Sequence, residues 1–213
     1  MLISSYNQAG MGDVLVLLTA PQSGATHSEQ KGDIVRLTNE KNETIGYNVL
    51  NVSQLLDLGD VAGQIQLDAD QVAILNQAIS AVGFTGDLVV DTDPKFVVGY
   101  VESAEPHPDS DHLQVTTTQI GNGETLQLVS GSPNMKAGIK VVVAKVGAMM
   151  PSGLIIWPGA LRGVESNGMI VSGRELALPN APQQPGALIL PDDFAEVGTP
   201  FDAKAPAAQA LFE

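Results

Sequence analysis

The chain has 213 residues, of which 44% are hydrophobic and 16% are charged, and its formal net charge is −14. This composition is typical of a folded protein, and the length allows one large or two small domains. No apolar run approaches the roughly 20 residues of a membrane helix, and the absence of cysteine excludes disulfides, thiolate zinc sites and cysteine nucleophiles. We expect a cytoplasmic protein that does not enter a membrane.

The first ninety residues combine short apolar runs with one helical segment. Strands are predicted at 14–18, 33–37 and 44–50. The clearest helix spans 68–81, where apolar residues recur at helical spacing. Asp68 is its candidate N-cap and Gly83 its candidate stop. Residues 1–89 therefore predict a small α+β domain.

After a polar stretch broken by proline at 91–94, strand signals dominate the chain. They are predicted at 96–101, 113–120, 125–129, 140–146, 154–156 and 169–171. Short strands separated by Gly-rich turns indicate a closed or partly closed barrel over 90–202. Ser172 and Glu175 have capping-box spacing, which predicts one helical turn after the last strand. Residues 203–213 are predicted to be an Ala-rich tail.

Several motifs follow one another in a characteristic order. They are Val98-Gly99-Tyr100-Val101, His107-Pro108-Asp109-Ser110-Asp111, Leu128-Val129-Ser130-Gly131-Ser132-Pro133-Asn134 and the segment from Leu161 to Leu176. In order and spacing they resemble the EMAP-II-like tRNA-binding domain, which also occurs in the bacterial phenylalanyl-tRNA synthetase β subunit. Gly12-Asp13-Val14-Leu15 and Gly32-Asp33-Ile34-Val35 are similar to the N-terminal extension of YtpR-type tRNA-binding proteins.

This resemblance implies an α+β N-terminal domain followed by an all-β OB-fold barrel. It implies that tRNA is recognised by shape and backbone contacts, without catalytic activity, cofactor or metal. It also implies a homodimer, and an aminoacyl-tRNA synthetase as a partner.

The segment 162–169 is the strongest candidate for binding RNA. The guanidinium of an arginine can form two hydrogen bonds to a phosphate, and serine and asparagine side chains can hydrogen-bond to ribose hydroxyls. Methionine offers a flexible apolar surface to a base or ribose. Alternatively, Gly163 and Gly168 shape a barrel corner and Met169 belongs to the core. With the family resemblance, we predict phosphate contacts by Lys136, Lys140, Lys145, Arg162 and Arg174. Asn134, Ser166 and Met169 are predicted to shape the contact.

The charge of this half limits how RNA can bind. Between Asp91 and Gly198, six basic residues stand against twelve acidic residues. RNA binding therefore requires that the cations gather along one wall of the barrel. If they do not, the same barrel is predicted to be a protein-interaction module with weak or lost RNA affinity. A third possibility is an enzyme, but the chain has only three histidines and so offers few candidates for general acid–base catalysis.

Two further features allow more than one interpretation. Trp157, the only tryptophan, could stack on a base, pack internally or contact a second copy. The two imidazoles and two carboxylates within 107–112 have metal-binding donors. However, Pro-Asp-x-Asp is also turn chemistry, because Asp side chains accept hydrogen bonds from nearby amides.

Overall fold

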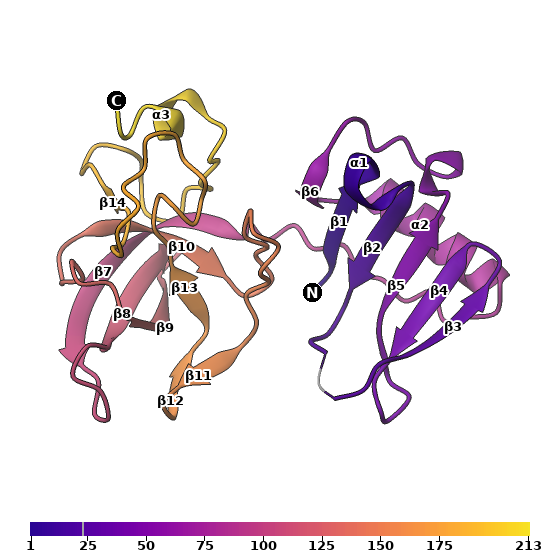
Figure 1. Cartoon of the computed structure of the whole chain (residues 1–213), viewed down its shortest axis with the longest axis horizontal. Coiled ribbons are helices and arrows are strands. Elements are labelled where there is room, and N and C mark those ends of the chain that lie inside the picture. The colour runs from indigo at the N-terminus through magenta and orange to yellow at the C-terminus, as the bar shows by residue number, and fades with distance from the viewer. Residues whose placement is uncertain (23) are drawn as a thin grey trace. The chain divides into compact units, whose positions relative to one another are not determined.

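The computed structural model describes residues 1–22 and 24–213, which form two compact units (Figure 1). The first unit is Met1–Asp93 and the second is Pro94–Glu213. Antiparallel strands form most of the regular structure in both units. Within the described ranges, no helix is long and apolar enough to cross a membrane.

The first unit is a six-stranded antiparallel sheet with one long helix. Its strands are β1 (Ile3–Asn7), β2 (Val14–Leu18), β3 (His27–Lys31), β4 (Ile34–Thr38), β5 (Thr44–Leu50) and β6 (Ala62–Ile65). The strand order is β3-β4-β5-β2-β1-β6. The helical segments are α1 (Gln8–Met11), η1 (Val52–Gln54) and α2 (Ala69–Ala81). The three strands and the long helix predicted from the sequence are confirmed.

Helix α2 begins at the predicted cap and packs on the sheet. Asp68 Oδ1 accepts from Gln71 N at 2.8 Å, and Gln71 Oε1 accepts from Asp68 N at 3.0 Å. Val72, Leu75 and Ile79 are buried in one cluster with inward-facing residues of β2 and β5. Burying each of these side chains contributes about 1.5–3 kcal/mol, so packing on the sheet is the main source of helix stability.

Asp13 joins three segments of the first unit. Its carboxylate accepts hydrogen bonds from the Tyr6 hydroxyl at 3.0 Å, the Ser53 hydroxyl at 2.6 Å and the Ser53 N–H at 3.1 Å. The hydrogen bond from the Ser53 hydroxyl holds the pKa of Asp13 below its usual value. Burial and the nearby Asp13 raise the pKa of Tyr6. Ionised Asp13 therefore stabilises the start of β2 against η1.

We expect Asp13→Asn to lower the melting temperature at pH 7, because the charged acceptor is lost. A carboxylate whose pKa is lowered by folding stabilises the native state above its unfolded pKa of about 3.9. This contribution disappears as the pH falls through the folded pKa. The difference in melting temperature between wild type and Asp13→Asn should therefore shrink toward zero in strongly acidic solution. Equal differences at pH 7 and pH 2, measured by circular dichroism, would contradict this role.

The second unit contains a curved antiparallel sheet with the order β13-β10-β7-β8-β9, and β14 also pairs with β10. The strands are β7 (Phe96–Pro106), β8 (Gln114–Gly121), β9 (Glu124–Ser130), β10 (Lys140–Lys145), β13 (Gly168–Ile170) and β14 (Ile189–Leu190). A separate hairpin is formed by β11 (Gly159–Leu161) and β12 (Val164–Ser166), and α3 (Pro206–Gln209) lies near the C-terminus.

The segment that joins β12 to β13 is hydrogen-bonded to β9, at the opposite edge of the sheet. Gln127 Nε2 donates to Glu165 O at 2.9 Å, and Asn167 N donates to Gln127 O at 3.2 Å. Gly168 has a φ of 143°, and a Cβ there would lie 2.8 Å from the carbonyl oxygen of Ala144. Glycine is therefore needed where the chain crosses toward β10. These contacts link the two edges of the sheet through residues 165–168.

One prediction for the second unit needs correction. The predicted strand at 154–156 is wrong, because this segment forms only a bridge between Met149 and Ile155 beside a tight turn. Residues 203–213 pack against the second unit: Ala208 is buried in its core, and a Cβ on Gly173 would lie 2.6 Å from the Phe212 ring. The C-terminal segment is therefore part of the unit's packing.

The predicted helical turn after Ser172 is confirmed. Glu175 Oε2 accepts from both Ser172 N and Ser172 Oγ at 2.7 Å, and Ser172 Oγ accepts from Glu175 N at 3.1 Å. Leu176 N donates to Ser172 O at 3.2 Å, which closes one turn. The turn ends at Ala177, whose φ is 53°. Arg174 therefore sits on a fixed turn directly after β13.

Candidate nucleic-acid interface

The candidate segment 162–169 begins in the tight turn of the β11–β12 hairpin. Arg162 and Gly163 occupy the turn with φ values of 46° and 83°. Two left-handed residues are typical of a type I′ turn, whose twist matches that of the strands. The left-handed region costs a non-glycine residue roughly 1–2 kcal/mol. Contacts of the hairpin with its surroundings must therefore offset the strain at Arg162.

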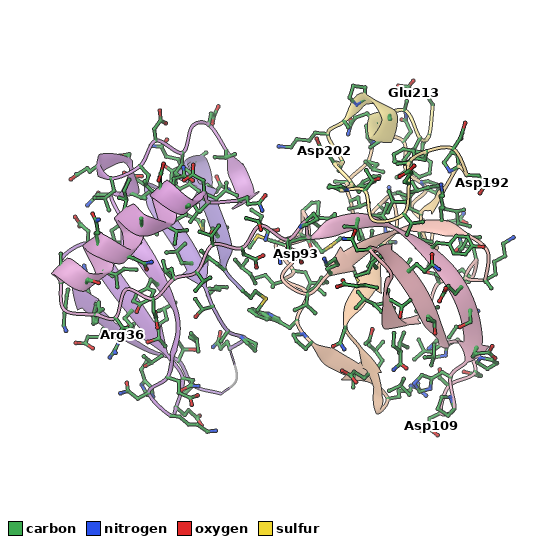
Figure 2. The ribbon with its side chains drawn as sticks, turned by 180° about the vertical axis from the view of Figure 1, so that it is seen from behind. Arg36, Asp93, Asp109, Asp192, Asp202 and Glu213 are labelled. Carbon is green, nitrogen blue, oxygen red and sulfur yellow. The ribbon has the colours of Figure 1, made fainter. Side chains whose placement is uncertain are left out.

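Hydrogen bonds fasten this turn to the loop between β7 and β8, where Figure 2 labels Asp109. Arg162 Nη1 donates to Asp109 O at 2.9 Å. His107 Nε2 lies 3.0 Å from Leu161 O, and Asp109 N donates to His107 Nδ1 at 3.0 Å. Because Nδ1 accepts, Nε2 carries the proton and donates to Leu161 O, so the buried imidazole is neutral. His107 positions the hairpin.

The same hydrogen bonds argue against the metal interpretation of residues 107–112. Both ring nitrogens of His107 are occupied by backbone groups. His112 Nδ1 lies 3.0 Å from Asp111 Oδ1, and this contact lowers the pKa of Asp111. In the described parts of the chain, no three His, Asp or Glu side chains are arranged to hold a metal ion. The segment is a turn that anchors the hairpin.

Ser166 is buried and holds the hairpin to the sheet. Its Oγ accepts a hydrogen bond from Val129 N at 3.0 Å and donates to Gly168 O at 3.2 Å. Asn167 Nδ2 donates to Glu165 Oε1 at 2.6 Å. The Ser166 hydroxyl therefore has both partners within the protein, and its role is to position β12 and β13.

Asn134 and Lys140 are also engaged by the backbone. Asn134 Nδ2 donates to Ala187 O at 2.9 Å, and Asn134 Oδ1 accepts from Ala187 N at 2.8 Å. Lys140 Nζ donates to Ala195 O at 2.8 Å and to Asp192 O. These two side chains fix the segment that carries β14. In this structure Asn134 and Lys140 therefore stabilise the backbone around β14.

The predicted cations do not gather along one wall. Arg162 is bonded to the carbonyl of Asp109 and Lys140 to the carbonyl of Asp192, and Figure 2 shows these two aspartates at opposite ends of the second unit. Lys140 and Lys145 lie at opposite ends of β10, about 17 Å apart at roughly 3.3 Å per residue. The expectation of a single basic wall is therefore wrong for these residues.

Met169 and Arg174 are the predicted residues that the structure does bring together. Both line an open depression of about 490 Å³ beside β13. Its lining residues are Met150, Pro151, Ser152, Leu154, Met169, Arg174, Glu175 and Ala177. Lys145 pairs with Gly168 in the β10–β13 register, so its side chain lies on the face of the sheet opposite to Met169. The depression combines apolar side chains with an exposed guanidinium at its edge.

The charges around the depression favour an anionic ligand at Arg174. The carboxylate of Glu175 is held by Ser172 N and Oγ. Arg174 and Lys136 are exposed, and neither forms an ion pair with a carboxylate anywhere in residues 1–22 and 24–213. A guanidinium can bind a phosphate through two parallel hydrogen bonds.

Leu154 is a candidate binding residue that the sequence did not reveal. Leu154 is 57% exposed and follows the Pro-Ser-Gly turn that begins at Pro151. The position of Leu154 directly after a polar turn was a signal for an exposed apolar residue, but the same pattern also predicts a strand at 154–156. Trp157 is half-buried immediately before β11, and its stacking on a base stays a prediction.

Comparison with known proteins covers both units. Residues 21–91 match the family model "Domain of unknown function (DUF4479)", and residues 96–200 match "Putative tRNA binding domain". The phenylalanine–tRNA ligase β subunit of Acinetobacter baylyi is 42% identical over 141 residues, which are 66% of this chain but 16% of that subunit. A solved structure, the C-terminal domain of Plasmodium vivax p43, aligns with 51% of this chain and 59% of its own at 26% identity and a TM-score of 0.37.

A relative that aligns over nearly its whole length shows which family the chain belongs to. The Bacillus subtilis protein described as "Putative tRNA-binding protein YtpR" is 47% identical over 201 residues, which are 92% of this chain and 97% of that protein. The order of the two matched domains agrees with the two units of the structure. The chain therefore belongs to the YtpR family of tRNA-binding proteins.

Proposed function

We propose that the chain binds tRNA through its second unit, and that this unit is an OB-fold barrel. The membership in the YtpR family supports the ligand, and the hydrogen bonds between β9 and residues 165–168 support a barrel. OB-folds bind oligonucleotides on a strand face and its bordering loops. The proposal includes a cytoplasmic location and no catalytic activity of the chain's own.

The depression beside β13 carries the proposal. Met169 and Leu154 offer an apolar surface to a base or ribose, and Arg174 is free to meet a neighbouring phosphate. Lys145 lies on the other face of the sheet from Met169, and is proposed as a separate phosphate contact. Lys136 and Arg162 are proposed as further phosphate contacts, while Asn134, Lys140 and Ser166 are proposed to support the site by holding its backbone.

We expect filter binding with bulk tRNA to show a modest salt dependence. If Arg174 and one further cation meet two phosphates, the slope of log affinity against log salt is about −1.4 to −1.8. Arg174→Ala should reduce affinity about tenfold and the slope by about one. Leu154→Ala should reduce affinity several-fold without changing the slope, because it removes only apolar contact.

Lys204→Ala is the matched control for charge. Lys204 is exposed just before α3, outside the depression, so its loss changes the net charge equally and should leave the slope unchanged. Equal effects of Arg174→Ala and Lys204→Ala would show that only overall charge matters. tRNA affinity that is absent even at low salt would refute the proposal.

The alternative is a protein-interaction module, which has one specific observation in its favour. Leu154 and Leu161 are 57% and 42% exposed on a unit that carries few cations, so two large apolar side chains are available to a protein partner. An aminoacyl-tRNA synthetase is the proposed partner, supported by the likeness to the ligase β subunit. Binding of a synthetase without tRNA affinity would favour this alternative.

A further inference from the structure

The connection from β5 to β6 crosses one end of the sheet in the first unit. Strand β5 ends beside the start of β2, and β6 starts beside the end of β1. Residues 51–61 therefore pass the same ends of β2 and β1 that α1 connects, and Figure 1 shows α1 beyond the ends of these two strands. The Asp13 carboxylate joins the two segments, because it accepts a hydrogen bond from the Ser53 hydroxyl at 2.6 Å. The surface formed by residues 8–13 and 51–61 is here called the α1 end.

Large apolar side chains are exposed on the α1 end. Met11 is 49% exposed and Leu55 is 40% exposed, and each lies two positions from the hydrogen bond that joins the two segments. Leu58 and Val61 are half-buried and pack against the core of the first unit, so apolar groups continue from the core to the surface. A single exposed apolar residue is common, but a group of them marks a binding surface. Methionine also adapts its shape to an irregular partner.

Every charged residue at the α1 end is acidic. Its two segments contain Asp13, Asp57 and Asp60, and no lysine, arginine or histidine. Asp33, which accepts from Asn51 Nδ2 at 3.0 Å, adds a fourth carboxylate beside them. In the part of the chain that the structure describes, none of these four carboxylates forms an ion pair with a basic side chain. The exposed apolar side chains are therefore accompanied by negative charge that the protein itself does not neutralise.

The sign of this charge selects the partner. RNA is held through its phosphates, which carboxylates repel. A second copy of this chain offers no complement, because its ten lysine and arginine residues are at least four positions apart and form no basic run. We propose that the α1 end docks a cationic, amphipathic segment of another protein. The apolar residues of that segment cover Met11 and Leu55, while its lysines or arginines face the four carboxylates. This inference does not depend on tRNA binding.

The exposure of the carboxylates predicts a weak complex that is sensitive to salt. Asp33, Asp57 and Asp60 are exposed, and ion pairs at exposed positions contribute little to affinity. Their attraction for a cationic segment mainly speeds its association and is screened over about 10 Å at 0.1 M salt. We therefore expect micromolar binding at low salt, which weakens about fivefold between roughly 50 and 300 mM salt.

Fluorescence anisotropy with the full chain and without RNA tests the proposal. The probe is a labelled peptide of about 14 residues, in which leucines follow helical spacing and lysines fill the other positions. One reference peptide has glutamine in place of each leucine, and the other has glutamate in place of each lysine. The wild type should bind the Lys–Leu probe at least about tenfold more tightly than either reference. Equal binding of the Lys–Leu and Lys–Gln peptides would overturn the proposal, because it would show only the attraction of a chain with net charge −14.

Paired substitutions of apolar residues locate the binding surface. Met11→Gln combined with Leu55→Gln should weaken binding of the Lys–Leu probe about tenfold, because the apolar contact is lost. Ile74→Gln combined with Val89→Gln is the matched control. These two side chains are 37% and 71% exposed in the same unit but lie outside the α1 end, so this variant should bind like the wild type.

Paired substitutions of acidic residues test the role of charge. Asp57→Asn combined with Asp60→Asn should weaken binding about threefold and reduce its salt dependence. Glu40→Gln combined with Asp70→Asn removes the same charge at the other end of the sheet, where β4 ends and α2 begins, and should change neither. Control pairs that weaken binding as much as the test pairs would overturn the proposal. So would a wild type that does not bind the Lys–Leu probe at low salt.

Discussion

Replacing His107 by alanine is expected to destabilise the second unit by about 2–4 kcal/mol. The imidazole is 3% exposed and bonds the Asp109 N–H and the Leu161 carbonyl at the same time. Each polar group left unpaired costs about 1–3 kcal/mol, and the lost ring volume adds a cavity. Urea denaturation followed by the fluorescence of Trp157, the only tryptophan, measures the change within this unit.

The matched control for His107 lies five positions further along the same loop. The side chain of His112 is 62% exposed and contacts only surface groups, so His112→Ala should change the free energy of unfolding by less than about 0.5 kcal/mol. His107→Asn should recover part of the loss, since its amide offers one donor and one acceptor. If both alanine variants behave alike, the hairpin is not anchored through His107.

The loss of His107 also has a consequence for RNA binding. Arg162 adopts a left-handed conformation in a turn that is held by Asp109 and His107. Without that anchor the turn can relax and the guanidinium moves away from its present position. We expect the salt slope of tRNA binding to change in His107→Ala if Arg162 meets a phosphate. An unchanged slope would restrict the contact to the depression beside β13.

Elements with strong local signals could be predicted from the sequence. Helix α2 has a cap and helical spacing of its buried residues, and β2 is a run of five apolar residues. Strand β3 was missed because all five of its residues are exposed and polar; its pairing with β4 is visible only in three dimensions. The β11–β12 hairpin was missed because Arg162-Gly163 lacks the usual Asn or Asp of this turn.

The candidate site was harder to predict than the fold. Ser166, Asn134 and Lys140 belong to residue types that bind RNA, but their partners are backbone groups 2 to 55 residues away in the chain. A sequence shows the donors and acceptors without showing which are already paired. Met169 and Arg174 were recognised from a motif and do share one depression, because the Ser172–Glu175 turn fixes Arg174 just after β13.

Leu75→Ala is expected to destabilise the first unit by about 2–5 kcal/mol. Leu75 is fully buried where α2 meets the sheet, and removing a buried leucine side chain creates a cavity in addition to losing apolar burial. Ile74→Ala is the control on the same helix, because Ile74 is 37% exposed; its effect should stay below about 1 kcal/mol. Calorimetry should show the transition of the first unit moving to lower temperature.

This variant also separates the roles of the two units. The depression with Met169 and Arg174 lies wholly in the second unit, whereas Leu75 lies in the first. At a temperature where Leu75→Ala has unfolded only the first unit, the tRNA affinity per chain should be kept. A loss of tRNA affinity at that temperature would mean that the first unit contributes directly to RNA binding, since nothing in the second unit has then been altered.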